Sequence, residues 1–174
     1  VQIEATEEDA ERCRINITSS DSSFTLSGMP GHLFPGIDQE DEGVHLQITA
    51  SDLKELLNNV LFAASPQSHN PIFEGVLLEV KDGKLYTIAS DTYRVAIDTV
   101  SVDTESFKAI VPAKTLAEVN KIITDPEEIT NCIVSTKNIK ITYKDYIISA
   151  RLFAGECPDL LNVFPQTYKT KAIV

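Results

Sequence analysis

The sequence predicts an α+β fold in which two amphipathic helices pack on antiparallel sheet. Residues 53–61 and 116–123 carry apolar side chains at the three- and four-residue spacing of one helix face. The strand-like runs between and after them are short and joined by tight turns, which leaves no room for parallel crossovers. We therefore expect antiparallel strands with both helices on one side of the sheet.

The first 43 residues predict little regular structure. Residues 1–11 are acidic and show neither a helix cap nor a strand pattern, so we expect a frayed end or the middle of a domain. Two short strands are expected at 13–19 and 23–27, where polar and apolar residues alternate. Gly and Pro then break the chain twice, and the acidic residues 39–43 indicate a linker.

A complete domain is predicted from Val44 onward. A strand at 44–48 leads into the first helix, which Thr49 or Ser51 can cap. Asp82-Gly83 is a strong signal for a tight hairpin, because both residues tolerate positive φ. The other expected strands lie at 72–80, 84–90, 94–100 and 107–111 before the second helix, which follows Pro112, and at 131–135, 138–143 and 146–152 after it.

The bulk composition is that of an ordinary globular protein, with 43% hydrophobic residues and no Trp. No apolar run approaches the length of a membrane span, and the N-terminus does not resemble a signal peptide. Cys13, Cys132 and Cys157 are odd in number and far apart. This pattern fits reduced thiols of a cytosolic protein better than a disulfide framework or a zinc site.

The net charge of −11 argues against a simple nucleic-acid binder, which is usually basic. The charge is uneven, since residues 1–43 carry −8, residues 44–165 carry −5 and the last nine residues carry +2. An acidic protein can still bind DNA when its few cations gather on one surface. The positions of the lysines therefore matter more than the total charge.

The sequence shows no set of residues that indicates catalysis. It has no Gly-rich phosphate loop, nucleophile elbow or HExxH motif. His32, His45 and His69 lack the spacing of metal ligands, and Asp91 fits a tight turn better than a catalytic carboxylate. We predict a protein that is not an enzyme and has no catalytic residue, metal site or cofactor.

An internal repeat is suggested by the two segments 24–35 and 148–165. Each contains an apolar strand, a Gly/Pro break and Phe-Pro, although the spacer is longer in the second. The simplest interpretation is two consecutive copies of one domain, the first lacking its start. Chance similarity of two strand ends is the alternative. The repeat predicts that residues 166–174 begin a third copy.

Several motifs, taken in order, resemble the bacterial DNA polymerase III beta subunit family, the sliding clamps. The most specific is IASDTYRVA at 88–96, which is similar to the A-T/S-D-x-x-R-L/V-A core of that family. The G-x-x-P-D run at 155–159, followed by Phe-Pro at 164–165, is nearly as specific. The resemblance implies a DNA-clamp-like fold divided into the tail of domain one plus a linker (1–43), a complete domain two (44–165) and the start of domain three (166–174).

The resemblance implies a processivity factor for DNA replication. In this family, two three-domain protomers form a homodimeric ring around duplex DNA without sequence specificity. The ring tethers the catalytic subunit of DNA polymerase III, the clamp loader and other proteins that carry a clamp-binding motif. A location in the bacterial cytoplasm, associated with the nucleoid, follows. The alternative is an acidic α+β protein-interaction module with no DNA role; three domain copies in the full-length chain, or salt-sensitive retention on circular but not linear DNA, would favour the clamp.

The resemblance also implies which residues face DNA. Sliding needs weak attraction to phosphates and no base contacts that would hold the ring in place. In the family the helices line the pore, and a polar loop reaches toward the duplex. Carried over to this chain, the DNA-facing residues are Lys54, Gln67, Asn70, Pro71, Lys114 and Lys121. For the lysines, an ordinary solvated helix face is the alternative.

The family binds a short apolar peptide in a groove where domain two meets domain three. Carried over position by position, the groove residues are Phe73, Ser90, Thr92, Tyr93, Arg94, Val95, Pro158, Asn162 and Val163. Apolar members would hold Leu and Phe anchors, while polar members would orient the peptide. Core packing is the alternative for Phe73 and Val95. Because domain three supplies the other wall, we expect these 174 residues to bind such a peptide weakly.

Overall fold

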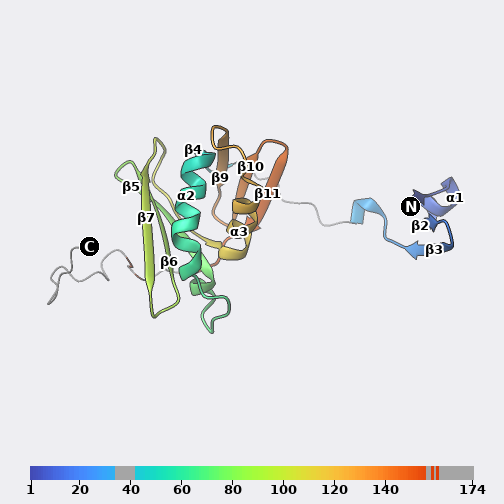
Figure 1. Cartoon of the computed structure of the whole chain (residues 1–174), viewed down its shortest axis with the longest axis horizontal. Helices are drawn as coiled ribbons and strands as arrows, with labels where there is room; N and C mark the ends of the chain where they lie inside the picture. The colour runs from blue at the N-terminus through green and yellow to red at the C-terminus, as the bar shows by residue number, and fades with distance from the viewer. Residues whose placement is uncertain (34–41, 156–157, 159, 161–174) are drawn as a thin grey trace. The chain divides into compact units, whose positions relative to one another are not determined.

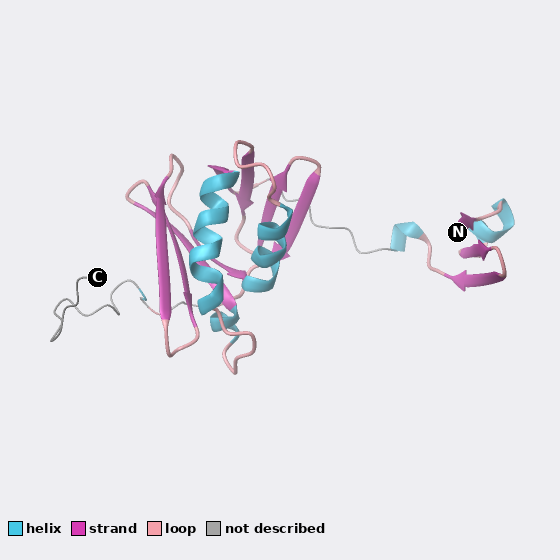
Figure 2. Cartoon of the chain, in the orientation of Figure 1, coloured by secondary structure: helices cyan, strands magenta, loops and turns pink. Residues whose placement is uncertain are grey.

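A computed structural model describes residues 1–33, 42–155, 158 and 160 (Figure 1). The chain divides into two compact units, residues 1–38 and 39–174, and each is described by itself. Both units combine strands with short helices, as Figure 2 shows by colour. In the described part of the chain, no helix is long and apolar enough to cross a membrane.

The first unit contains a three-stranded antiparallel sheet. Its strands are β1 (Gln2–Glu4), β2 (Arg14–Ser19) and β3 (Ser22–Ser27), in the order β1-β2-β3, with the helix α1 (Glu7–Glu11) between the first two and the 3₁₀ turn η1 (Gly31–Leu33) after the third. The two strands predicted here are confirmed to within a residue.

The expectation that residues 1–11 lack structure was wrong. β1 pairs with β2, with Gln2 opposite Thr18, and α1 begins with a capping box. The Oγ1 of Thr6 accepts a hydrogen bond from the N–H of Asp9 at 3.2 Å, and the carboxylate of Asp9 accepts one from the Thr6 hydroxyl at 2.8 Å. The sequence Thr-Glu-Glu-Asp carries this signal, so a local cap and a partner strand order an otherwise polar segment.

The second unit contains two four-stranded antiparallel sheets. One has the order β11-β10-β9-β4, with strands β4 (Val44–Thr49), β9 (Ile129–Val134), β10 (Asn138–Tyr143) and β11 (Tyr146–Arg151). The other has the order β7-β6-β5-β8, with strands β5 (Gly75–Lys81), β6 (Lys84–Ser90), β7 (Val95–Ser101) and β8 (Lys108–Pro112). The α+β class is confirmed. The expectation of a single sheet was wrong, because β9 returns to pair with β4 rather than with the strands before it.

The two sheets meet where the chain leaves β11. There the N–H of Phe153 donates to the carbonyl oxygen of Ile110 in β8 at 2.9 Å. Both sheets bury apolar side chains in one large core, which includes Leu46 and Ile141 from the first sheet and Val76 from the second. The helices α2 (Ala50–Val60) and α3 (Ala113–Ile122) complete this core.

The helices lie side by side over the sheets (Figure 1). Lys54, near the start of α2, reaches Ile123 at the end of α3, and Asn120 donates to Asn58 at 2.8 Å, so the helices run antiparallel. Of the two predicted caps of α2, Thr49 is the one used, since its Oγ1 accepts from the N–H of Asp52 at 3.1 Å. The prediction that both helices share one side is confirmed.

The strand predicted at 72–80 begins later than expected, at Gly75. Residues Pro71–Glu74 form a 3₁₀ turn, η3, which follows another such turn, η2 (Leu61–Ala63). The side chain of Asn70 caps η3 by accepting from the N–H of Ile72 at 3.2 Å, and Pro at the first position needs no hydrogen-bond acceptor. Two local signals thus override the apolar strand pattern.

The predicted internal repeat has a structural counterpart in two hairpins. In β2–β3, Arg14 pairs with Ser27 and Ser19 with Ser22, and in β10–β11, Asn138 pairs with Arg151 and Tyr143 with Tyr146. Each residue pair of β10–β11 lies 124 residues after the corresponding pair of β2–β3. The backbone hydrogen bond next to the open end of each hairpin also corresponds. The N–H of Gly28 donates to the carbonyl oxygen of Cys13, and the N–H of Leu152 donates to that of Lys137. Equal register and equal closure support the repeat.

Candidate peptide-binding and DNA-facing surfaces

The turn between β6 and β7 is fixed by its own side chains. The Oδ1 of Asp91 accepts from the N–H groups of Tyr93 at 3.0 Å and Arg94 at 3.1 Å. The Oγ of Ser90 accepts from the N–H of Thr92 at 3.2 Å, and Thr92 has a φ of 76°. A non-glycine residue in this left-handed region is held there by its surroundings. The conformation of the four groove candidates in this turn, Ser90, Thr92, Tyr93 and Arg94, is therefore set before any ligand arrives.

Asp91 has the structural role that the sequence predicts. Burial alone would raise the pKa of its carboxyl group, but hydrogen bonds from the N–H groups of Tyr93 and Arg94 and from the Arg94 guanidinium outweigh it and lower the pKa. The Oδ2 of Asp91 accepts from the Nε of Arg94 at 3.0 Å. The carboxylate is thus charged at neutral pH and holds the turn together.

Arg94 and Tyr93 project from this turn into solvent. Tyr93 is 97% exposed, and the side chain of Arg94 is 57% exposed. The guanidinium carbon of Arg94 lies 5.6 Å from the ring centroid of Phe62, which belongs to η2 and is itself exposed. Phe62 was not singled out from the sequence. The sequence did carry a sign of its exposure, because Phe62 falls outside the leucine stripe that faces the core from the first helix.

The outer face of the sheet β7-β6-β5-β8 carries a second apolar cluster. Leu77, Ile88 and Ile110 point away from the helices and pack with Leu160, while Val95 and Phe153 cover them partly. An antiparallel sheet with an apolar outer face needs a cover or a partner. The predicted groove residue Val95 is part of this cluster.

The remaining groove candidates are placed as follows. Phe73 is half-buried in η3, and its carbonyl oxygen accepts from the N–H of Ser65 at 2.8 Å. Pro158 is exposed, and its carbonyl oxygen accepts from the N–H of Leu160 at 2.7 Å. Leu160, which the sequence did not indicate, packs in the outer cluster. Asn162 and Val163 lie outside the described residues.

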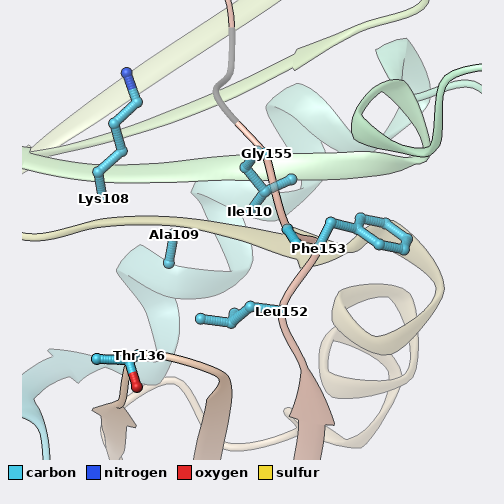
Figure 3. A pocket seen from close by; sticks show the side chains of 8 residues that line it. Lys108, Ala109, Ile110, Thr136, Leu152, Phe153 and Gly155 are labelled. Atoms are coloured by element: carbon cyan, nitrogen blue, oxygen red, sulfur yellow. The ribbon is translucent and has the colours of Figure 1, made fainter.

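A cavity of about 490 Å³ opens where the two sheets meet (Figure 3). Its walls come from the start of β8, from the turn after β9 and from the chain that follows β11. The lining residues are Lys108, Ala109, Ile110, Thr136, Leu152, Phe153, Ala154 and Gly155. None of these residues was predicted to bind a ligand, so the cavity does not coincide with the predicted groove.

The three predicted DNA-facing lysines differ in how they are engaged. Lys54 is half-buried, and its Nζ donates to the carbonyl oxygen of Ile123 at 2.6 Å. Lys121 forms an exposed ion pair with Glu118 at 2.7 Å, which contributes little stability. Lys114 is exposed in the first turn of α3. Lys114 therefore presents the least engaged charge of the three.

The loop between η2 and η3 lies at the same end of the helix pair as Lys114. Ser65, Pro66 and Lys114 line one small cavity of about 310 Å³. Gln67, Asn70 and Pro71, the predicted DNA-facing loop residues, are all exposed. The loop is internally ordered, since the side chain of Glu74 accepts from the N–H of Ser68 at 2.8 Å.

Thiol and metal chemistry find little support in the described residues. Burial raises the pKa of the Cys132 thiol to about 12, which makes it unreactive at neutral pH. No three His, Cys, Asp or Glu side chains of residues 1–33, 42–155, 158 and 160 gather where they could hold a metal ion.

Two antiparallel helices over two four-stranded antiparallel sheets form a clamp-type α+β domain. Residues 47–159 match the family described as the DNA polymerase III beta subunit, central domain, and the chain belongs to that family. This membership confirms the resemblance and the clamp-like fold. The family is named as a beta subunit of DNA polymerase III, which agrees with the expectation of a replication subunit without a catalytic role.

Curated and solved relatives agree. The beta sliding clamp of Bacillus subtilis (strain 168) is 30% identical over 161 residues, which cover 91% of this chain and 43% of the relative. The beta sliding clamp of Staphylococcus aureus (strain Mu50 / ATCC 700699) is 29% identical over 163 residues, covering 92% and 43%.

The crystal structure of the DNA polymerase sliding clamp from Bacillus subtilis superposes with a TM-score of 0.82 at 27% identity, over 95% of this chain and 43% of that one. A DnaN sliding clamp from Pseudomonas aeruginosa bound to griselimycin gives 0.78 at 25% identity, over 89% and 43%. The chain thus spans less than half the length of the relatives it matches.

Proposed function

We propose that this chain forms part of a ring that encircles duplex DNA without reading its sequence and tethers replication enzymes to it. In this proposal, residues 1–43 correspond to the tail of domain one and a linker, 44–165 to domain two and 166–174 to the start of domain three. The partners are the DNA polymerase III catalytic subunit, the clamp loader and other proteins with a clamp-binding motif. The ring is a homodimer when full length and works in the bacterial cytoplasm at the nucleoid.

The observation that carries the proposal is that the two faces of the sheet β7-β6-β5-β8 belong to two different apolar clusters. The face of β7-β6-β5-β8 toward the helices closes the main core, with Val76 and Leu78 pointing inward. The opposite face carries the outer cluster around Leu77 and Ile110, next to the exposed turn that ends at Arg94. A peptide with apolar anchors can bury its side chains on such a surface while DNA occupies the helix side.

The DNA contact is proposed to be weak and centred on one end of the helix pair. Lys114 supplies an exposed charge there, and Gln67 and Asn70 supply neutral donors nearby. Lys121 is paired with Glu118, and the half-buried Lys54 donates to the Ile123 carbonyl oxygen, so both are less available to a phosphate than Lys114. A surface that contacts few phosphates releases few counterions from the DNA, so binding stays weak. Weak binding suits a ring that must slide.

Peptide binding can be tested by an NMR titration of the 174-residue chain with a short peptide that contains Leu and Phe. We expect chemical-shift changes at Phe73 and at the turn before Val95, with weak affinity. Val95→Ala should weaken binding about three- to tenfold, because it removes apolar contact area. The matched control is Ile147→Ala, which changes an exposed residue of the other sheet. Equal loss in both variants, or no shifts at millimolar peptide, would overturn the groove.

DNA contact can be tested with two 20-base-pair duplexes of unrelated sequence at low salt. We expect the same small shifts for both duplexes, confined to α3 and the loop at Gln67 and Asn70. Lys114→Glu should abolish them, whereas Lys84→Glu, an equal charge change in the hairpin between β5 and β6, should not. Different shift patterns for the two duplexes would contradict sequence-blind binding.

A further inference from the structure

Phe62 and Arg94 form a pair that the proposed groove does not yet explain. Phe62 is 61% exposed, although an aromatic ring of this size is usually covered. Its backbone is held firmly, because Val60 and Ala63 on either side are fully buried and the N–H of Ala64 donates to the carbonyl oxygen of Leu61. The ring therefore stands at a fixed position in solvent, and the guanidinium of Arg94 lies over it.

The guanidinium of Arg94 is held from two sides. Asp91 accepts a hydrogen bond from its Nε at 3.0 Å, and the Phe62 ring lies 5.6 Å below its central carbon. In the part of the chain that the structure describes, Nε is the guanidinium nitrogen that has a partner, and the two terminal nitrogens have none. A planar guanidinium fixed in this way offers two parallel N–H donors to a carboxylate.

The position of this donor pair suggests what it recognises. Arg94 directly precedes Val95, which packs in the outer cluster with Leu160, so the turn that carries Arg94 borders the apolar surface. The segment that carries Phe62 is joined to Phe73 through the hydrogen bond from Ser65 to the Phe73 carbonyl. Because the Asp91 carboxylate offsets much of the Arg94 charge, recognition here depends on the directed N–H donors of the guanidinium.

We propose that Phe62 is a positioning residue that holds Arg94 so that it binds a carboxylate of the docked peptide, next to the peptide's apolar anchors. This inference rests on the proposed function and names the ligand chemistry of the same groove. Phe62 acts through Arg94 and need not touch the peptide itself. The ring restricts the rotamers of a long side chain, and this restriction lowers the entropy lost on binding.

The test compares two fluorescein-labelled hexapeptides that share Leu and Phe anchors and differ in one residue, Asp or Asn. Wild-type chain should bind the Asp peptide about tenfold more tightly, and the preference should shrink as salt rises. Phe62→Ala should weaken the Asp peptide about two- to fivefold and leave the Asn peptide unchanged. Phe62→Tyr should restore the preference. Tyr146→Ala, which removes another exposed aromatic ring, is the matched control and should change neither affinity.

The outcomes separate this inference from the proposed function. If neither peptide binds the wild-type chain, the groove itself is refuted. If both peptides bind wild type equally well, the groove stands and carboxylate recognition is refuted. If Phe62→Ala weakens both peptides to the same extent, Phe62 is an apolar wall and not a positioning residue. Circular dichroism of each variant checks that the fold is unchanged.

Discussion

Lys54 donates a hydrogen bond from its Nζ to the carbonyl oxygen of Ile123 at 2.6 Å, which joins the first turns of α2 to the end of α3. The last carbonyl groups of a helix lack partners within the helix and carry partial negative charge. A lysine from the neighbouring helix supplies both a donor and a positive charge. The residue that the clamp resemblance assigns to the DNA surface therefore also holds the two helices together.

Replacing Lys54 by Met should destabilise the chain by about 1 kcal/mol, because the helix end loses a charged donor while the apolar stem is kept. Urea unfolding followed by circular dichroism measures the change. Lys121→Met is the matched control, since its exposed pair with Glu118 should contribute less than about 0.5 kcal/mol. Equal stability of the two variants would show that the bond to Ile123 has no energetic role.

Tyr143 should stabilise the segment after α3 through its hydroxyl group. The Tyr143 oxygen accepts from the N–H of Asp125 at 2.8 Å and from that of Thr124 at 3.2 Å, while the ring is buried. Tyr143→Phe leaves both donors without an acceptor, so we expect a clear fall in the urea midpoint. Tyr146→Phe removes a hydroxyl from an exposed ring and should leave the midpoint unchanged.

Stability should fall in acid partly through Asp125. The hydrogen bond from Lys144, the N–H of Glu127 and the charge of Lys144 lower the pKa of this carboxyl group. A carboxyl group with a lowered folded-state pKa stabilises the fold above its unfolded pKa of about 4, and this contribution is lost as pH falls through the folded value. Asp125→Asn should therefore have a flatter dependence of unfolding free energy on pH between about 2 and 5. An unchanged dependence of the unfolding free energy on pH would show that Asp125 does not contribute to the loss of stability in acid.

Most of the fold could be predicted because its signals are local. The stripe at Leu53, Leu56 and Leu57 defined α2, and Asp82-Gly83 defined a hairpin whose φ values are 52° and 71°. The second sheet could not be predicted, because the return of β9 to β4 is a pairing over about 85 residues that no periodicity encodes. The strand predicted at residue 72 failed for a different reason: the Asn70 cap and Pro71 outweighed the apolar pattern.

The candidate site divides along similar lines. The turn at Asp91 followed from residue type, since Asp accepts hydrogen bonds from backbone groups within its own turn. The stacking of Arg94 on Phe62 joins residues far apart in sequence, so no local motif predicts it. The engagement of Lys54 was equally hidden, because a surface position on a helical wheel does not show which carbonyl group lies next to it.

Cys132 should resist thiol reagents in the folded chain. Its side chain is buried, and burial raises the thiol pKa to about 12, so the reactive thiolate is scarce at pH 8. Iodoacetamide labelling followed by peptide mass spectrometry should modify Cys132 only after urea is added. Cys13 is half-buried in the other unit and serves as the internal comparison. Rapid labelling of Cys132 without denaturant would show that its surroundings open readily.

The packing of the outer apolar cluster should require glycine at position 75. A Cβ at this position would lie 2.5 Å from a side-chain carbon of Ile110 and 3.0 Å from the ring of Phe153. Gly75→Ala must therefore displace side chains that form the floor of the proposed groove, at a cost of about 1–3 kcal/mol. Thermal unfolding measures this loss, and Gly31→Ala, whose added Cβ meets nothing within 4 Å, is the matched control. Peptide affinity should fall together with stability in Gly75→Ala. A variant that is as stable as wild type would show that Ile110 and Phe153 rearrange freely, which contradicts a preformed floor.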